Sequence, residues 1–318
     1  MLKVDKDVGN RKKVLLMGRA GAGKTSMRSI IFANYKPRDT LRFTTTNNIE
    51  HSHLLFFGNL TLSIWDCGGQ DTFMENYFES QRENIFRNTQ VLIYVMEARS
   101  KYLHSPQSKM EIDNDLYYYR NTVKNLKFFS PESQIFCLLH KIDRVPRKDR
   151  EATLCYYKRE IENNSMGIRH FIFPTTIWDE SLYAAWSEIV CALIPNVRVL
   201  ESCLEDLSGC CEVSELVLLE RSTFLVISFT ESSRKYRSRF EKISNICKRF
   251  KITCARSQTN FTSLILKTRN FVCMIKKFTR NSFILAVMSN GSLITPTLYN
   301  IECAKDHFES IIASHIYK

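Results

Sequence analysis

The chain has 318 residues, of which 44% are apolar, and this is enough for two hydrophobic cores at the ~100–200 residues that one domain usually takes. No apolar run approaches the ~20 residues that a membrane-spanning helix needs, which argues against a direct transmembrane span. Lys and Arg outnumber Asp and Glu by 45 to 33, giving a formal net charge of +12. Residues 1–10 form a charged tail that lacks the apolar core of a signal peptide.

Apolar runs alternate with amphipathic stretches from residue 11 to residue 195, a pattern that predicts an α/β domain. Strands are expected at 13–17, 51–57, 60–66, 91–96, 134–139 and 170–174, and helices at 24–34, 109–129, 149–163 and 180–193. The sheet should be mixed and mostly parallel. Only the strand at 51–57 should be reversed, because a short Gly58-Asn59 turn joins it to the next strand.

A phosphate-binding loop is predicted at residues 18–25, which read G-R-A-G-A-G-K-T. The strand before it and the helix after it are the context that the motif requires, which a chance glycine-rich turn would lack. Glycines let the backbone wrap closely around phosphates, so that successive N–H groups and the helix N-terminus face the anion. Lys24 would reach the outer phosphates, and Thr25 would be a magnesium ligand. The loop therefore predicts a nucleotide switch or a phosphoryl-transfer site.

A second motif, D-C-G-G-Q at residues 66–70, follows directly on a predicted strand. The end of this strand should lie beside the phosphate loop in a doubly wound sheet. Asp66 can hold magnesium through water, the Gly69 amide can sense a terminal phosphate, and Gln70 can orient the attacking water. Alone, the segment would be only a tight turn, and its pairing with the upstream loop is what favours a nucleotide hydrolase.

The sequence H-K-I-D at residues 140–143 follows another apolar strand and indicates guanine as the base. The carboxylate of Asp143 can accept both the ring N–H and the exocyclic amine of guanine, whereas adenine has no such pair of donors. The Lys141 stem can pack against the ring system while its ammonium stays solvated. Most guanine sites have asparagine where this chain has His140.

The pattern of elements changes after Pro195-Asn196, which marks the expected boundary of a second domain at 196–318. Its predicted elements are a helix at 197–215, a strand pair within 216–229, a helix at 240–250, strands at 262–267, 271–278 and 282–288, and a helix at 298–312. Periodicity alone predicts an α+β domain with an antiparallel sheet and helices on one face. An edge or a face of that sheet would then be available to another subunit.

Basic residues are concentrated at 221–280, where fifteen Lys and Arg stand against two Asp and Glu. Two explanations of this basic segment remain open. It could attract anionic lipid or an acidic scaffold surface, or it could be an ordinary solvated face. Nucleic acid is disfavoured as a partner, because basic clustering is necessary for it and far from sufficient. The densest cluster is expected in a loop and contains Arg234, Lys235, Arg237 and Arg239.

The eleven cysteines include no C-x-x-C pair and are expected to be free structural thiols. The Cys210-Cys211 pair has no explanation in the sequence. His51 and His53 would share one face of a strand, but no third ligand is apparent, so a zinc site is not expected.

These segments together resemble the Rag/Gtr family of small GTPases, on the Rag A/B side of that family's heterodimer. The likeness is carried by K-V-L-L-M-G-R-A-G-A-G-K-T-S-M-R-S-I-I-F-A-N-Y at 13–35, E-H-S-H-L at 50–54, W-D-C-G-G-Q-D-T-F-M-E-N-Y-F at 65–78, I-W-D-E-S-L-Y-A-A-W at 177–186 and F-E-K-I-S-N-I at 240–246. The family's guanine motif also begins with histidine. The resemblance implies a P-loop GTPase domain with a mixed, mostly parallel six-stranded sheet at 11–195, followed by a roadblock-like dimerisation domain at 196–318.

The resemblance also implies a role for individual residues. Gln70 would be catalytic, His140 and Asp143 would read the base, and Ile177 would close over it. The residues expected to hold phosphates or magnesium are Gly21, Gly23, Lys24, Thr25, Ser26, Thr46, Asp66 and Gly69, with Thr40 as a further candidate near the nucleotide.

Two departures from the family's pattern affect this assignment. The family usually has G-A-T-I-D-V where this chain has T-T-T-N-N-I at 44–49, so the choice among three threonines stays open, with Thr46 as the first candidate. Ala20 and Ala22 replace small hydroxyl residues in the phosphate loop. Binding should survive this change, because backbone amides make most of the phosphate contacts.

The first class of function is a regulatory switch that uses GTP, GDP and Mg²⁺. GTP would order the segments 38–50 and 67–80, and hydrolysis would release them. Hydrolysis should be slow, because the sequence shows no arginine of its own for the transition state. The resemblance implies a Rag C/D-like partner, activating and exchange proteins, and a scaffold complex at the vacuolar or lysosomal surface, where amino-acid status passes to the TOR kinase complex. The chain would be cytoplasmic and peripheral on that membrane, with the nucleus as a second location.

The second class is an interaction protein in which the GTPase half is a degenerate scaffold. The intact set of Lys24, Thr25, Asp66, Gly69, Gln70 and Asp143 argues against it. A membrane-recruited GTPase of the Arf type is the alternative within the first class. That alternative does not explain the long C-terminal domain or His140, and position 2 is Leu rather than the glycine that myristoylation needs.

Overall fold

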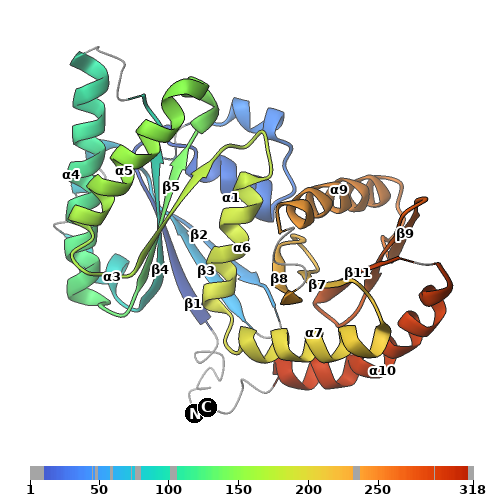
Figure 1. Cartoon of the computed structure of the whole chain (residues 1–318). Helices are drawn as coiled ribbons and strands as arrows, with labels where there is room; N and C mark the ends of the chain where they lie inside the picture. The colour runs from blue at the N-terminus through green and yellow to red at the C-terminus, as the bar shows by residue number, and fades with distance from the viewer. Residues whose placement is uncertain are drawn as a thin grey trace, which may run out of the picture. The chain divides into compact units, whose positions relative to one another are not determined.

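The structure is a computed structural model that describes residues 11–44, 46, 49–57, 60–72, 74–75, 80–100, 106–231, 237–289 and 291–313. Its contacts divide the chain into two compact units (Figure 1). The first unit contains Lys12–Leu54 and Leu62–Ala185. The second contains Leu55–Thr61 and the described residues from Trp186 onward. The domain limit expected at residue 195 stays a prediction.

The first unit is built on a mixed, mostly parallel six-stranded sheet, as predicted. Its strands, in spatial order, are β2 (Glu50–Leu55), β3 (Thr61–Asp66), β1 (Arg11–Met17), β4 (Thr89–Glu97), β5 (Gln134–His140) and β6 (His170–Thr175). The pairs β1–β4, β4–β5 and β5–β6 are parallel. The neighbours β2 and β3 are joined only by residues 56–60, too few for a parallel crossover, so β2 is the reversed edge strand.

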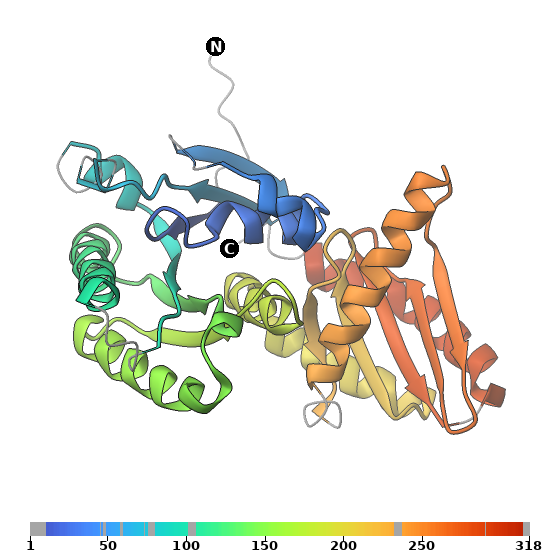
Figure 2. The same ribbon diagram turned by 90° about the horizontal axis from the view of Figure 1, so that it is seen from above.

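All four long helices expected in this part of the chain are present. They are α1 (Lys24–Phe32), α4 (Pro106–Phe129), α5 (Arg150–Asn164) and α6 (Ser181–Leu193). Short helical turns that periodicity cannot detect accompany them: η2 (Pro37–Arg42), α3 (Arg82–Phe86), η3 (Ile142–Arg144) and η4 (Arg147–Asp149). One core cluster joins alternate strand residues such as Leu92 and Tyr94 to α3, α4 and α5, and α1 lies on the other face of the sheet (Figures 1 and 2).

The second unit holds a five-stranded sheet with neighbouring strands antiparallel in the order β8 (Val226–Phe229), β7 (Glu215–Glu220), β11 (Ser282–Met288), β10 (Val272–Lys277) and β9 (Ser263–Lys267). Its helices are α7 (Val197–Cys211), α9 (Arg237–Arg256) and α10 (Ile294–Ala313), and η5 (Gly291–Leu293) precedes the last of them. This arrangement fits the predicted roadblock-like α+β domain.

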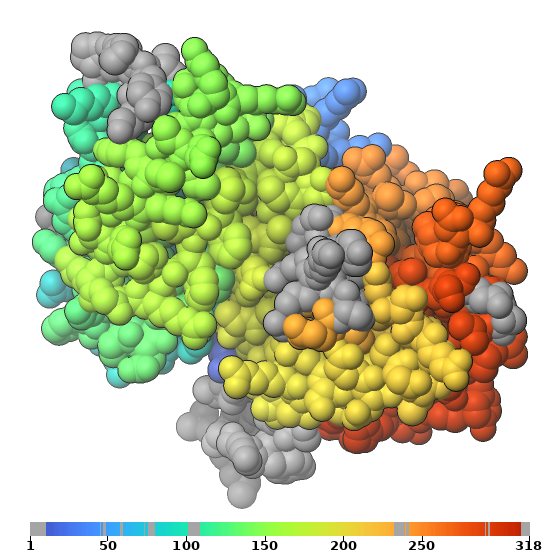
Figure 3. Space-filling model, viewed as in Figure 1, coloured from blue at the N-terminus to red at the C-terminus, as the bar shows by residue number. Residues whose placement is uncertain are grey.

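Helices cover both faces of this second sheet, so the expectation of helices on one face was wrong. On one face α9 contributes Cys247 to a cluster with Val217, Leu219 and Ile275. On the other face α10 reaches β10, where the Lys276 and Glu302 side chains form an ion pair of 3.0 Å, and α7 lies beside α10 (Figures 1 and 3). The reason lies in β7, whose L-V-L-L run at 216–219 is buried throughout, as in strands covered on both faces.

Helix boundaries of the second unit also differ from expectation: α9 ends at Arg256 rather than at residue 250, and α10 begins at Ile294 rather than at residue 298. Helix α7 ends at Cys211 rather than at residue 215, because Glu212 has a left-handed backbone with φ of 50°. Helix α9 begins at Arg237, so Arg237 and Arg239 lie in a helix and not in a loop, and Arg239 forms an ion pair with Glu215. Arg234 and Lys235, the other two members of the basic cluster, lie outside the described residues.

All eleven cysteines lie among the described residues and are free thiols. No group of three or more His, Cys, Asp or Glu side chains in the described part of the chain could hold a metal ion. Within the same residues, every helix is too short or too polar to cross a bilayer.

Candidate nucleotide-binding site

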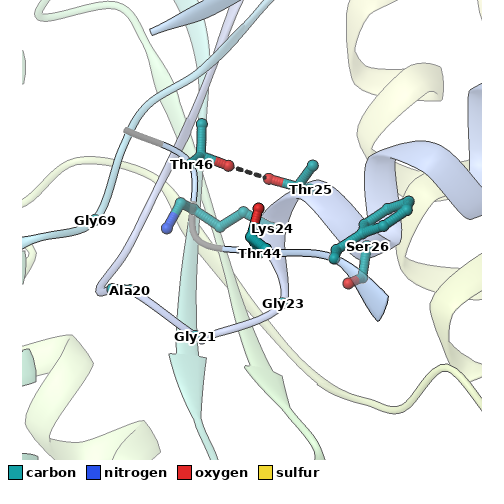
Figure 4. Close-up of a pocket in the computed structure, with 10 residues that line it drawn as sticks. Ala20, Gly21, Gly23, Lys24, Thr25, Ser26, Thr44, Thr46 and Gly69 are labelled. Atoms are coloured by element: carbon teal, nitrogen blue, oxygen red, sulfur yellow. Dashed lines mark hydrogen bonds between the residues drawn. The ribbon is translucent and has the colours of Figure 1, made fainter. Parts of the chain in front are cut away.

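The phosphate loop and two segments that approach it enclose a pocket in the first unit (Figure 4). The loop runs from the end of β1 to the start of α1, and the other two segments lie before β2 and after β3. The residues that line the pocket are Ala20, Gly21, Gly23, Lys24, Thr25, Ser26, Phe43, Thr44, Thr46 and Gly69. Seven of the predicted site residues therefore meet in one cavity.

The glycines of the loop allow conformations that other residues disfavour. Gly21 and Gly23 have φ of 78° and 102°, in the range that L side chains rarely adopt. A Cβ on Gly23 would also lie 2.8 Å from Cδ2 of His140. Because α1 begins directly after Gly23, the first amides of that helix face the pocket without an intrahelical acceptor, which suits an anion.

Lys24 is the cation of the pocket and is only 5% exposed. Its Nζ atom donates to the carbonyl oxygens of Gly18 at 2.7 Å and Arg19 at 3.0 Å, so the ammonium lies over the loop (Figure 4). Burial lowers the pKa of Lys24, and the nearby Asp66 carboxylate opposes that shift. Phosphate oxygens could replace the two carbonyls as stronger, charge-assisted acceptors.

Oxygen atoms that could bind magnesium lie near Lys24, on Thr25, Thr46 and Asp66. The hydroxyl oxygens of Thr25 and Thr46 are 2.8 Å apart (Figure 4). Asp66 is fully buried, its Oδ1 atom has no hydrogen-bond partner, and its Oδ2 atom accepts from Nε of Arg28 at 3.1 Å. Burial raises the pKa of Asp66, against the Thr25 hydroxyl and the charges of Arg28 and Lys24. Hydroxyl and carboxylate oxygens are the ligands that Mg²⁺ prefers, and the orphaned Oδ1 atom fits a hydrated ion.

The structure separates the candidate threonines. Thr46 contacts Thr25, and Thr44 lines the pocket without a described bond to Thr25. Thr45 lies outside the described residues. Thr40 is buried in η2, where its hydroxyl donates to the Pro37 carbonyl at 2.8 Å, and it is not among the described residues that line the pocket.

Gly69 is pressed against the backbone of the phosphate loop. The Ala20 amide donates to the Gly69 carbonyl at 2.7 Å. A Cβ on Gly69 would lie 2.4 Å from backbone atoms of Gly18, Arg19 and Ala20, so only glycine fits this contact. Gln70 follows Gly69 directly in the chain and is half-buried.

His140 connects the base side of the site to the phosphate loop. The imidazole is 2% exposed, lies against Gly23, and places Nδ1 3.0 Å from the hydroxyl of Thr175 at the end of β6. Burial and the Lys141 charge lower the pKa of His140 to about 4, so the ring is neutral at physiological pH. A neutral ring can make both contacts without a buried charge.

The Lys141 ammonium is not simply solvated as expected. It donates to the Gly21 carbonyl at 2.7 Å and lies 3.2 Å from Oε1 of Glu97. The backbone of Lys141 is left-handed, with φ of 60°. Asp143 is exposed in η3, and Ile177 is half-buried two residues after β6. Asp143 follows β5, which ends at His140 beside the loop, and Ile177 follows β6, whose last residue Thr175 contacts His140. Their contact with a base stays a prediction.

Sequence reasoning missed Arg28, which lies one turn after Lys24 on α1. It bonds Asp66, the Ser52 hydroxyl at 2.8 Å and Glu50, and so ties the start of β2 to the end of β3. The i,i+4 spacing from Lys24 was the available signal, because it places both cations on the same face of α1.

Comparison with known proteins decides the family. The pattern of the Gtr1/RagA G protein conserved region matches residues 13–247. The chain belongs to this family of G proteins. It is accordingly a GTP-binding GTPase, as its sequence predicts, and the resemblance to Rag A/B-type subunits is confirmed.

Its relatives cover nearly the whole chain. The "Ras-related GTP-binding protein A" of Dictyostelium discoideum is 46% identical over 96% of this chain and 99% of its own length. The "GTP-binding protein GTR1" of Saccharomyces cerevisiae is 42% identical over 94% of this chain and 99% of its own. The "GTP-binding protein GTR2" of the same yeast is more distant, at 27% identity over 69% of this chain.

Proposed function

We propose that this chain is the Rag A/B-type subunit of a Rag-type GTPase heterodimer. In this role it is a guanine-nucleotide switch that hydrolyses GTP slowly and relays amino-acid sufficiency to the TOR kinase complex. The observation that carries the proposal is the pocket in which Lys24, Thr25, Thr46 and Gly69 meet, in a chain matched by the family pattern over residues 13–247. Attachment to the vacuolar or lysosomal surface through a scaffold complex is part of the proposal.

The residues of the pocket divide the work of holding a nucleotide. Lys24 would exchange the Gly18 and Arg19 carbonyls for phosphate oxygens, while the amides of the loop and of α1, Ser26 included, hold the rest of the phosphate chain. Bound Mg²⁺ would neutralise charge that develops on the phosphates. Thr25 and Thr46 would hold the ion directly, and Asp66 would hold it through water.

Base recognition and catalysis fall to residues at the ends of neighbouring strands. Neutral His140 fixes Gly23 and the loop, so that Asp143 can accept the two guanine donors and Ile177 can pack on the base. Gln70 would orient the attacking water. No arginine is among the described residues that line the pocket, so fast hydrolysis would need an arginine from an activating protein.

The nucleotide state would be signalled by the two segments that touch the phosphate loop. Thr46 meets it through the Thr25 hydroxyl, and Gly69 meets it through the Ala20 amide. A terminal phosphate would hold both segments in place, and its loss would release them to exchange and effector proteins.

The first test is nucleotide binding and turnover by the full chain. Titration calorimetry should detect GTP and GDP and no binding of ATP. Gln70→Leu should keep GTP affinity and lose the hydrolysis that an activating protein stimulates. A preference for ATP, or unchanged stimulated turnover in Gln70→Leu, would refute this function.

The partner surface proposed for a Rag C/D-like subunit is the open edge and neighbouring helix of the second sheet. Strand β9 is an edge strand, and it exposes Ile265 and Leu266, while α9 exposes Ile246 and Phe250. Edge strands and exposed apolar side chains of this kind suit pairing with another chain.

Co-purification tests this surface. Ile265→Asp or Phe250→Asp should abolish one-to-one recovery of the Rag C/D-like subunit. Val199→Asp is the matched control, because Val199 is comparably exposed on α7, outside this surface, and it should leave recovery unchanged. Loss of recovery in the control alone would place the interface elsewhere.

A further inference from the structure

Arg19 lies in the phosphate loop but is not among the residues that line the pocket. Its Nε atom is 3.9 Å from Oδ1 of Asp71, the residue directly after Gln70. Its second acidic neighbour is Asp115 of α4, which is only 4% exposed. Burial raises the pKa of Asp115 to about 7, and Arg19 is the strongest charge that opposes the shift, ahead of Arg99. The Arg19 charge therefore acts on a carboxyl group of α4 as well as on Asp71.

Asp71 is held from α4 as well as from the loop. The Tyr118 hydroxyl hydrogen-bonds the Asp71 carboxylate, and this bond adds to burial in raising the pKa of Tyr118 to about 12. Tyr118 lies three residues after Asp115, and residues at this spacing share a face of a helix. Asp71 is itself 58% exposed, so its position depends on these two partners rather than on burial.

These contacts bracket Gln70. On one side the Gly69 carbonyl accepts from the Ala20 amide at 2.7 Å. On the other side Asp71 reaches Arg19 of the same loop. We propose that Arg19 is a positioning residue for GTP hydrolysis, which holds Asp71 and thereby keeps Gln70 beside the phosphate loop. The proposal rests on the function proposed for Gln70, and it involves no contact of Arg19 with the nucleotide.

The test is single-turnover hydrolysis by the full chain loaded with GTP, with GTP and GDP dissociation rates measured alongside. Asp71→Asn carries the test, because its exposed side chain does not threaten the fold. Hydrolysis should slow about two- to fivefold, the range of a partly exposed ion pair, with dissociation rates within about twofold of wild type. Glu75→Gln is the control, since it removes an exposed carboxylate of the same segment that has no described ion pair with Arg19.

Arg19 variants separate positioning from structure. Arg19→Ala should slow hydrolysis as Asp71→Asn does, Arg19→Lys should restore part of the rate, and Arg19→Ala with Asp71→Asn should be no slower than either alone. Raising KCl from about 50 to about 500 mM should slow the wild type toward the rate of Asp71→Asn, and should leave Arg19→Ala unchanged, because partly exposed pairs are screened.

Unchanged hydrolysis in Asp71→Asn and Arg19→Lys, while Gln70→Leu is slowed, would overturn the role of Arg19 and leave the proposed function intact. Additive losses in the double variant, or losses matched by faster GDP release, would also overturn it. Absence of GTP binding in the wild type would instead refute the proposed function.

Discussion

Replacing Gly69 by alanine tests the contact on which the switch depends. The added Cβ would lie 2.4 Å from backbone atoms of Gly18, Arg19 and Ala20, and backbone atoms cannot rotate away as a flexible side chain can. Overpacking of this kind costs about 1–3 kcal/mol, and the lost bond from the Ala20 amide to the Gly69 carbonyl costs about 0.5–1.5 kcal/mol. The contact as observed should therefore be destabilised by about 1.5–4.5 kcal/mol, or about 10- to 2000-fold.

The segment after β3 should move, because the phosphate loop cannot. Gly18 has φ of 138°, and a Cβ there would lie only 2.2 Å from the Val95 carbonyl, so the loop already sits as close to β4 as a backbone can. Withdrawal of Gly69 removes the amide that should reach a terminal phosphate. GTP affinity should fall by about tenfold or more, and GDP affinity should change by less than about threefold.

Stopped-flow measurement of GTP and GDP binding and release checks this expectation, together with thermal unfolding. Gly167→Ala is the matched control, since Gly167 has φ of 79° with nothing within 4 Å of an added Cβ. It should lower the free energy of unfolding by about 1 kcal/mol through backbone strain alone, and leave the ratio of GTP to GDP affinity unchanged. An unchanged ratio in Gly69→Ala, or equal losses for both nucleotides, would refute the reasoning.

Three other predictions concern the same pocket. Lys24→Ala should weaken GTP and GDP binding at least about 100-fold, because it removes the buried cation over the loop, and calorimetry showing retained affinity would contradict the loop assignment. Thr46→Ala should weaken GTP about tenfold in Mg²⁺ and not in EDTA, whereas Thr44→Ala should bind as wild type; the reverse order would exclude Thr46 as the magnesium ligand. The pKa of His140 is about 4 in the folded chain, against 6.5 for a free histidine. The unfolded chain therefore binds a proton at this residue at a higher pH than the folded chain does. The free energy of unfolding is largest above pH 6.5 and falls as the pH drops toward 4. His140→Asn should remove up to about 3 kcal/mol of this loss, measured by denaturant unfolding at pH 7 and 4.5. If the free energy of unfolding falls equally between these pH values in the wild type and the variant, His140 is not responsible.

Much of the nucleotide unit was predictable because its signals are local. The phosphate loop and the D-C-G-G-Q segment need particular residues at fixed spacings directly after a strand, and the long helices and six strands follow from hydrophobic periodicity. The sequence put Thr46 first among three threonines but could not decide between them, because the decision depends on which hydroxyl reaches Thr25 after folding, and in the structure Thr46 does so. Arg28 was missed for the same reason, since Asp66 and Ser52 come close to it only in the folded sheet.

The second unit was harder to predict because one signal was ambiguous. A continuous apolar run such as Leu216–Leu219 is compatible with a strand covered on one face or on both faces. Only the tertiary packing decides between these two cases: α9 packs against Val217, and α10 lies on the opposite face. The length of α9 was underestimated because its basic first turn resembles a solvated loop. Ion pairing of Arg239 with Glu215 of β7 stabilises that turn, and this partner lies outside the local sequence.

The phosphate loop explains how one site can report both the base and the number of phosphates. Four residues from three separate segments of the chain contact it directly: Thr46 at Thr25, Gly69 at Ala20, Lys141 at Gly21 and His140 at Gly23. Each contact involves the loop backbone or its first helical turn, so a displacement of the loop alters all four. Because the loop is also fixed against β4 at Gly18, it offers these segments a rigid common support. Loss of a terminal phosphate should therefore release the two outer segments and leave the base contacts in place, which is what a switch that retains GDP requires.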